Sequence, residues 1–458
     1  MAKKFLNYLP LIFLIIFSFF TRFYNLGYPS KVVFDESHHS LYATKYLSRQ
    51  YYFDTHPPLG KLLFGLAGFL AKNKPGFDFE IGKDYGDFNY LALRSVTALF
   101  GSLFVVLIYF LVKEAGFSQR VAFLASFLVL FDNASLVQSR FVLLDMILVF
   151  FIFLSLYLFL VTKRYQPFSK KWYFFYFLTG LAIGSAFSVK WPGFGVLVVI
   201  WASNIALDSF FSKPKKEKLA NIFFLFILPF LLYFFLFFLH FHFAAMPCFS
   251  NCGAVIEKII QNQVDLKEPI FTIPPSGNFF KKFWVAHNYM VWAAVSENYF
   301  TYRSPWWKWP LMVQPVPYFY EGVDDKISMI YFLGNPIVWS LGIIGILGFF
   351  VFLIRNCFSL FRANFSSNFY SKNLPILVLG YLTLFLPFGG IGRDVPVYYY
   401  LPALAFSLIL FSIFFEESLK IFLKSEKEIK FLFLTVLFVV LVGFICFAPF
   451  SYGFLLPR

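Results

Sequence analysis

Phe34-Asp-Glu-Ser-His-His39 is a polar stretch that directly follows an apolar run, residues 6–27, long enough to cross a bilayer. A second polar block, Tyr52-Phe-Asp-Thr-His-Pro-Pro-Leu-Gly-Lys61, comes soon after it. Together the two blocks put adjacent carboxylates, three histidines and a Pro-Pro turn at a boundary between water and membrane. Simple anchoring does not need such groups, whereas chemistry at a membrane surface does.

Composition places the chain among polytopic membrane proteins. It has 458 residues, of which 59% are hydrophobic and 14% charged, and Phe alone contributes 72. These values differ strongly from those of a soluble domain. The sequence predicts one all-α membrane domain over 1–458. Its eleven expected spans are 6–27, 91–112, 121–137, 141–162, 172–188, 192–210, 220–246, 331–354, 374–389, 396–415 and 431–450.

Charge is distributed unevenly over the predicted loops. Segments assigned to the cytoplasm carry 19 Lys and Arg against seven acids, counting Asp208 at the end of span 192–210, whereas loops 28–90 and 247–330 each hold seven bases and seven acids. Lys and Arg near span ends mark the cytoplasmic side. The pattern predicts a cytoplasmic N-terminus and two external loops. It also explains most of the net charge of +15 without a nucleic-acid partner.

The long external loops have further features. Within 28–90, residues 57–71 are apolar but too short to span comfortably, which predicts a helix lying along the interface. Loop 247–330 is rich in Trp, Tyr and Pro, which suit an interface belt or a sugar-binding wall. Its Cys248 and Cys252 could form a disulfide in an oxidising compartment, remain free thiols or bind a metal.

Asp35 and Glu36 are the first candidates for chemistry. A carboxylate next to hydrocarbon is partly desolvated, which raises its pKa and favours a role as general base. The alternative is an ordinary solvated loop acid, and the neighbouring His38 weighs against it.

Asp54 and His56 are the second pair of candidates. Pro57 and Pro58 fix the backbone and hold the preceding residue extended, which could aim His56 at a ligand. The same prolines also suit the plain start of the interfacial helix, because Pro is favoured there.

Four cations fall at the external ends of predicted spans: Arg94, Arg140, Lys190 and Arg393. Ionisable groups at membrane depth usually face a cavity or a partner. These cations could hold a lipid-linked phosphate through charge-assisted hydrogen bonds. Alternatively they extend to the interface or pair with Asp132, Asp145 or Asp394.

Metal binding has little support in the sequence. His240 and His242 lie near a span end, His287 is isolated, and no spacing matches a zinc motif. The first-loop acids could in principle take a divalent cation.

The motifs together resemble those of the protein O-mannosyltransferase family. The first block is similar to the family's Asp-Glu-x-His, and the second to its Phe-x-Asp-x-His-Pro-Pro-Leu. Further motifs follow in the same order along nearly the whole chain: Leu93-Arg94, Leu130-Phe-Asp-Asn133, Gln138-Ser-Arg-Phe141, Leu144-Asp145, Ser188-Val-Lys-Trp191, Pro305-Trp306, Gly334-Asn-Pro336 and Tyr400-Leu-Pro402.

The resemblance implies a GT-C glycosyltransferase architecture with about eleven transmembrane helices. It also implies transfer of mannose from a polyprenyl-phosphate-mannose donor to Ser or Thr of secreted proteins, with inversion and without metal or cofactor. By resemblance, Asp35 is the base, Glu36 and His56 shape the site, and Arg94 and Lys190 hold the donor phosphate. His38, Asp54, Arg140 and Arg393 complete the expected substrate-binding set.

The size of the second loop bears on location and on the alternatives. Eukaryotic members of the family carry a large sugar-binding-like domain there, which the 84 residues of 247–330 cannot hold. This favours a prokaryotic enzyme of the cell membrane over one of the endoplasmic reticulum. A transferase that moves another sugar, such as aminoarabinose, onto lipid is the rival enzyme. A transporter is the rival from another class, and it would place its ionisable groups near the midplane.

Overall fold

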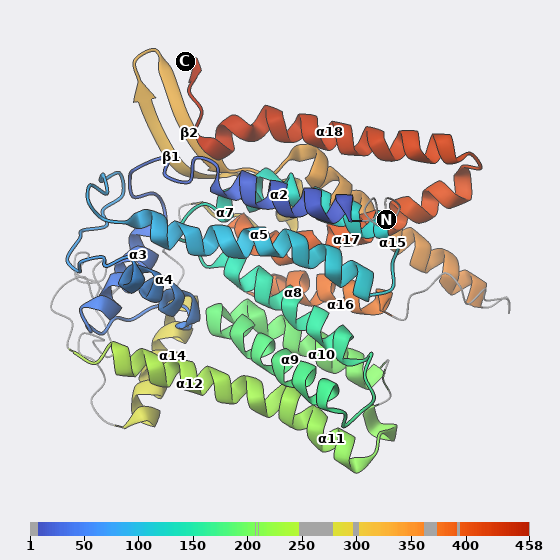
Figure 1. Ribbon diagram of the computed structural model, residues 1–458, viewed down its shortest axis with the longest axis horizontal. Coiled ribbons are helices and arrows are strands. Elements are labelled where there is room, and N and C mark those ends of the chain that lie inside the picture. The colour runs from blue at the N-terminus through green and yellow to red at the C-terminus, as the bar shows by residue number, and fades with distance from the viewer. Residues whose placement is uncertain are drawn as a thin grey trace.

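The computed structural model describes residues 8–206, 208, 210–246, 278–295, 302–360, 373–391 and 394–457. Long helices run alongside one another through most of these residues (Figure 1). The helices that fall on the predicted spans are α2 (Leu9–Phe23), α5 (Tyr90–Glu114), α6 (Gln119–Leu130), α7 (Asn133–Gln138), α8 (Asp145–Thr162), α9 (Lys170–Val189), α10 (Phe194–Ala206), α11 (Lys215–Ile222), α12 (Leu228–Phe243), α15 (Pro336–Leu360), α16 (Leu374–Phe385), α17 (Leu401–Phe422) and α18 (Glu426–Tyr452).

Each of the eleven predicted ranges overlaps a helix or consecutive helices. In the described part of the chain, six helices are long and apolar enough to cross a membrane, and six shorter apolar helices accompany them. One of the shorter helices is α4 (Leu59–Leu70), which coincides with the predicted interfacial helix 57–71. The number of spans itself stays a prediction.

Two predicted ranges differ from the structure. The range 121–137 is broken at Asp132, whose carboxylate accepts the backbone N–H of Ser135 at 2.9 Å and so starts α7 as a separate helix. The range 331–354 begins too early, because residues 326–332 form a strand and α15 starts only at Pro336. Residues 329–333 are continuously apolar and were joined to the apolar helix, although Gly334-Asn-Pro336 separates the two.

A small antiparallel sheet was not predicted. Its order is β1 (Val316–Val323), β2 (Lys326–Phe332) and β3 (Leu456–Pro457). A β-bulge lies between Pro317 and Phe319, so that Tyr318 is the extra residue of β1. Two more helices, α3 (Glu36–Leu47) and α14 (Phe279–Val295), belong to the predicted external loops.

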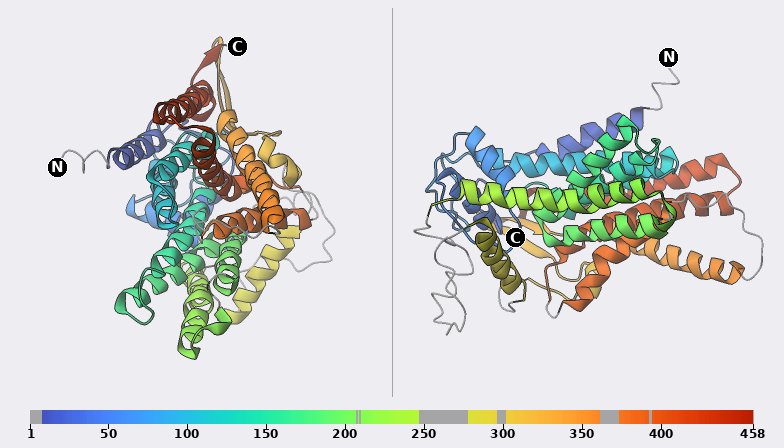
Figure 2. Two further views of the ribbon diagram at one scale, coloured as in Figure 1. Left: turned by 90° about the vertical axis from the view of Figure 1, so that its right-hand side faces the viewer. Right: turned by 90° about the horizontal axis from the view of Figure 1, so that it is seen from below.

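The two predicted external loops meet at one end of the bundle. Figure 1 shows α3, α4 and the β1–β2 hairpin at the left, opposite the N-terminus, and the second view of Figure 2 agrees. Lys31 of the first loop pairs with Glu321 of the hairpin, and the Tyr28 hydroxyl donates to Ser328 at 2.7 Å. This shared end is what the charge pattern predicts, although the side of the membrane stays a prediction.

Helices α17 and α18 have opposite environments. In the most apolar stretch of α17, which includes the short turn before it, 89% of the residues are buried inside the protein. In α18 the corresponding share is 11%, and this helix runs along one edge of the molecule (Figure 1). The core of the bundle therefore lies around α17 and α8, whereas α18 is peripheral.

Candidate functional site

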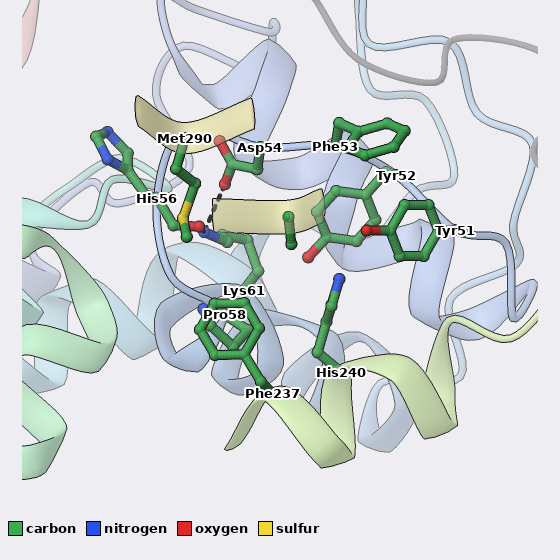
Figure 3. Close-up of a pocket in the computed structure, with 11 residues that line it drawn as sticks. Tyr51, Tyr52, Phe53, Asp54, His56, Pro58, Lys61, Phe237, His240 and Met290 are labelled. Atoms are coloured by element: carbon green, nitrogen blue, oxygen red, sulfur yellow. Dashed lines mark hydrogen bonds and ion pairs between the residues drawn. The ribbon is translucent and has the colours of Figure 1, made fainter. Parts of the chain in front are cut away.

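The second polar block is fixed by a buried ion pair. Lys61 Nζ lies 2.5 Å from Asp54 Oδ2, and their side chains are 1% and 9% exposed. The same ammonium donates to the carbonyl oxygens of His56 at 2.7 Å and Pro57 at 2.6 Å. Figure 3 shows the His56 ring turned away from this pair. Lys61 thus holds the turn before α4, a role that the sequence pattern does not predict.

A pocket lies between this block, α12 and α14 (Figure 3). Its empty volume is about 300 Å³, counted to its open mouth. The Tyr52 hydroxyl donates to that of Tyr46 at 2.8 Å, which in turn lies 2.9 Å from Nδ1 of His240. Tyr51, only 3% exposed, has a hydroxyl without a hydrogen-bond partner among the described residues. The pocket therefore combines an aromatic wall with polar groups.

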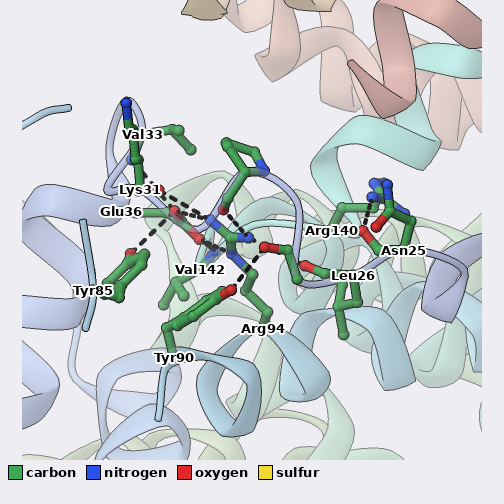
Figure 4. Close-up of polar contacts among 12 residues, drawn as sticks. Asn25, Leu26, Lys31, Val33, Glu36, Tyr85, Tyr90, Arg94, Arg140 and Val142 are labelled. Atoms are coloured by element: carbon green, nitrogen blue, oxygen red, sulfur yellow. Dashed lines mark hydrogen bonds and ion pairs between the residues drawn. The ribbon is translucent and has the colours of Figure 1, made fainter. Parts of the chain in front are cut away.

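Glu36 starts helix α3, and its carboxylate is completely buried. Arg94 on α5 holds it at two points, with Nε–Oε1 and Nη2–Oε2 both 2.8 Å (Figure 4). The carboxylate also accepts the backbone N–H of Val142 at 3.0 Å and the Tyr85 hydroxyl at 3.2 Å. Glu36 therefore ties the first loop to α5 and to the link between α7 and α8.

Arg94 uses all of its hydrogen-bond donors inside the protein. Besides the two bonds to Glu36, Nη1 donates to the carbonyl oxygens of Leu26 and Pro29, and Nη2 to that of Lys31. A guanidinium has five N–H donors, and these five bonds use each of them. Its role in holding a phosphate stays a prediction, and the geometry favours a structural role.

Arg140 also lies inside the protein. Its guanidinium donates to the carbonyl oxygens of Tyr24 and Asn25, just after α2, and its Cζ lies 4.6 Å from the centre of the Tyr452 ring. These contacts join the end of α2 to α18 and leave the side chain fully buried. Its predicted contact with substrate is likewise untested.

Asp35 differs from its neighbour. It is the residue before α3, but its side chain makes no capping hydrogen bond, and it is half-buried. Burial raises the pKa of the Asp35 carboxyl above its ordinary value, while the charges of His38 and Lys190 oppose that rise. Hydrogen bonding to Tyr398 also lowers it. A carboxylate of this kind suits proton transfer.

Lys190 follows α9 and reaches the same region. Its Nζ lies 2.8 Å from Asp145 Oδ1, and both side chains are buried. The ammonium also lies 5.4 Å from the ring centre of Tyr398 and 5.1 Å from that of Tyr399. Asp145 accepts one of its three N–H donors. A cation with remaining donors, close to Asp35, is the arrangement that an anionic ligand needs.

The remaining predicted residues do not share one location or role. His38 is exposed beside Asp35, whereas Arg393, Cys248 and Cys252 lie outside the described residues. Asp132 accepts from the backbone N–H of Asn335 and from Trp339 and is structural. Within the described ranges no group of three His, Cys, Asp or Glu is placed to bind a metal ion.

Sequence reasoning missed Tyr398 and Tyr399, which face Lys190. The run of three tyrosines at 398–400, at the external end of a predicted span, was a signal for them. It also missed Tyr318, which no local pattern distinguishes from the other aromatics of its loop.

Comparison with known proteins gives two family matches. Residues 12–244 match the model of the dolichyl-phosphate-mannose-protein mannosyltransferases, and residues 279–458 match the C-terminal four-helix membrane region of protein O-mannosyltransferases. Dolichyl-phosphate-mannose–protein mannosyltransferase 3 of Saccharomyces cerevisiae is 37% identical over 245 residues, which are 51% of this chain. The match covers 32% of that relative, so the chain corresponds to about a third of its length.

Solved structures agree on the fold. The S. cerevisiae Pmt1–Pmt2 complex bound to the sugar donor has a TM-score of 0.84 at 19% identity, covering 98% of this chain and 90% of that one. ArnT of Cupriavidus metallidurans, bound to undecaprenyl phosphate, has a TM-score of 0.53 at 13% identity, covering 96% and 76%. At these identities the likeness shows the fold alone, and it is the predicted GT-C glycosyltransferase architecture.

Proposed function

The chain belongs to the dolichyl-phosphate-mannose-protein mannosyltransferase family, and on that premise we propose that it transfers mannose from polyprenyl-phosphate-mannose to Ser or Thr hydroxyls of proteins. The reaction would take place at the external face of the cell membrane, with the N-terminus in the cytoplasm. Acceptors would be secreted or translocating proteins.

The observation that carries the proposal is the contrast between the two adjacent acids. The Glu36 carboxylate is buried and accepts hydrogen bonds from Arg94 on both oxygens, whereas the Asp35 carboxylate is half-buried and has a raised pKa. A hydroxyl becomes nucleophilic only as it loses its proton, and a positioned carboxylate of raised pKa can accept that proton. Asp35 is therefore the proposed general base.

The proposed reaction is a single displacement. The acceptor oxygen forms a bond to the anomeric carbon of mannose while the bond from that carbon to the phosphate oxygen breaks. The hydroxyl proton passes to Asp35, and the polyprenyl phosphate leaves as a stable anion that needs no acid. Attack from the side opposite the phosphate inverts the anomeric centre. The partial exposure of Asp35 then lets the proton return to water.

Lys190 is the proposed contact for the donor phosphate. Its ammonium lies in the same region as Asp35 and has donors beyond the one given to Asp145. Charge-assisted hydrogen bonds to a phosphate would place the leaving group beside the base. The aromatic rings of Tyr398 and Tyr399 exclude water from this cation and strengthen its electrostatic field.

The test uses the purified full chain in lipid nanodiscs. It is incubated with polyprenyl-phosphate-mannose and a peptide rich in Ser and Thr, and the peptide mass is followed. A gain of one hexose, lost on β-elimination of the Ser or Thr linkage, is expected. A second reaction supplies polyprenyl-phosphate-aminoarabinose with a lipid acceptor. Transfer to lipid without transfer to peptide would refute the proposal in favour of the rival enzyme. Movement of donor across the membrane of sealed vesicles that contain the same protein, without transfer, would favour a transporter.

A further inference from the structure

Tyr318 is an inward-pointing residue on a strand that is otherwise partly exposed. It is the extra residue of the bulge in β1, and both it and the next residue, Phe319, are buried. A regular strand alternates its faces, so two consecutive buried side chains require the backbone to turn locally. The bulge provides that turn and directs the Tyr318 ring into the end of the bundle where Asp35 lies.

The Tyr318 ring packs directly on Phe34, the residue before Asp35. The ring centres are 4.3 Å apart and the planes are 11° from parallel. Phe34 has a φ of +45°, in the left-handed region that aromatic side chains rarely adopt. Such a conformation persists only when its surroundings hold it. The stacked ring of Tyr318 and the edge-on ring of Tyr398, 6.2 Å away, lie against the Phe34 ring, while the N–H of Glu36 donates to the Val33 carbonyl oxygen across the turn.

The Tyr318 hydroxyl fixes the other end of the ring. It donates to Oε1 of Gln138 at 2.7 Å, and Nε2 of Gln138 donates to Asp145 at 3.0 Å. Asp145 in turn pairs with Lys190. Tyr318, which belongs to the second predicted loop, therefore contacts both the segment that carries Asp35 and the hydrogen-bond network that ends at Lys190.

We propose that Tyr318 is a positioning residue for the transfer reaction, which holds Phe34 in its left-handed conformation and thereby sets the direction of the Asp35 carboxylate. This inference rests on the proposed function. The turn at Phe34 determines where α3 begins. It therefore also determines where the side chain of Asp35, the residue just before α3, points. A displacement of about 1 Å in a reacting group can reduce a rate by about 10²-fold.

The experiment compares variants at this contact with the wild-type full chain in nanodiscs. Tyr318→Leu removes the stacking ring and is expected to lower kcat by about 10²-fold while the KM for polyprenyl-phosphate-mannose stays within about threefold. Tyr318→Phe keeps the ring and is expected to recover most of this loss. Tyr320→Leu is the matched control, because Tyr320 lies on the same strand and is 64% exposed. Its kcat is expected to equal that of the wild type.

A double-mutant cycle separates positioning from general damage. If Tyr318 acts through Phe34, the double variant Phe34→Leu/Tyr318→Leu loses no more than the larger single loss. Additive losses, or a kcat of Tyr318→Leu equal to that of the wild type, overturn the inference. If Tyr318→Leu does not fold, Phe34→Leu alone decides by the same split between kcat and KM. A wild-type chain that transfers no mannose to peptide refutes the proposed function instead, so the two failures are distinct.

Discussion

Glu36 and Arg94 form a two-point ion pair from which solvent is excluded on both sides. The carboxylate of Asp35, the residue before Glu36, instead interacts with the charges of His38 and Lys190 and with the Tyr398 hydroxyl. Two acids with the same chemistry thus have different surroundings, because Asp35 faces the Lys190 region and Glu36 faces α5. If this difference reflects their roles, substitutions of Asp35 will change the reaction and substitutions of the Glu36–Arg94 pair will change stability.

Replacing Asp35 by Asn is expected to lower kcat by about 10²–10⁴-fold, because the amide keeps the shape but cannot accept a proton. Binding of the lipid donor should remain. Turnover is measured with saturating donor and peptide, with Asp78→Asn as the control at an exposed acid of the same loop. Near-normal turnover of Asp35→Asn would direct attention to Asp54.

Replacing Arg94 by Met is expected to lower the free energy of unfolding by about 3–5 kcal/mol, because the buried carboxylate of Glu36 loses its counter-charge. Denaturant unfolding in detergent measures the change. Adding Glu36→Gln to this variant should recover part of the loss, since no buried charge then remains. A stable Arg94→Met protein with weakened donor binding would instead support the phosphate role.

Replacing Lys190 by Met is expected to weaken donor binding by about one to two decades, the effect of losing a charged hydrogen bond of roughly 1.5–3 kcal/mol. Titration with polyprenyl-phosphate-mannose measures the affinity. Lys83→Met removes an exposed cation of the first loop and is the control. Unchanged affinity in Lys190→Met would leave Lys190 as a structural partner of Asp145.

The pH dependence of kcat follows from the raised pKa of Asp35. The base works only when deprotonated, and burial favours its protonated form, so activity should fall with decreasing pH sooner than for a free Asp. Lys190 opposes this rise, so Lys190→Met should move the fall to still higher pH. Rates at saturating substrate across the acid range measure both. Superimposable profiles for the two proteins would contradict this assignment.

Topology can be tested at two exposed positions in a cysteine-free background. Tyr320→Cys lies on the hairpin, and Gln166→Cys lies between α8 and α9. An impermeant thiol reagent is expected to label the first in intact cells and the second only after permeabilisation. The reverse pattern would invert the charge-based orientation.

The sequence was informative where residues capable of chemistry lie at the ends of predicted spans. The two polar blocks after the first span lie together at one end of the bundle, as expected, and Asp35, Lys190 and Asp145 meet there. The family resemblance indicated Asp35 as the base, but the sequence did not reveal the different surroundings of Asp35 and Glu36, which arise from residues about 60 to 360 positions away. Arg94 has the depth expected of a ligand-binding cation, yet its partners are mainly backbone carbonyls, which no residue pattern reveals.

The hairpin shows a second limit. Strand β2 is separated from the apolar helix α15 only by the short segment Leu333-Gly-Asn335, and the bulge at Tyr318 depends on pairing between strands. Neither leaves a helical or alternating pattern long enough to recognise.

The unequal burial of α17 and α18 has a consequence for how each can change. Side chains of α17 must fit neighbours of fixed shape, so even a change of one methylene group is felt. Most of the apolar stretch of α18 is not buried inside the protein, and if lipid tails cover it, they are fluid and accept any hydrocarbon outline. Random apolar substitutions should therefore be tolerated along the outer face of α18 but should destabilise the protein when they are made in α17. A spectroscopic probe attached to the outer face of α18 should for the same reason leave the interior undisturbed.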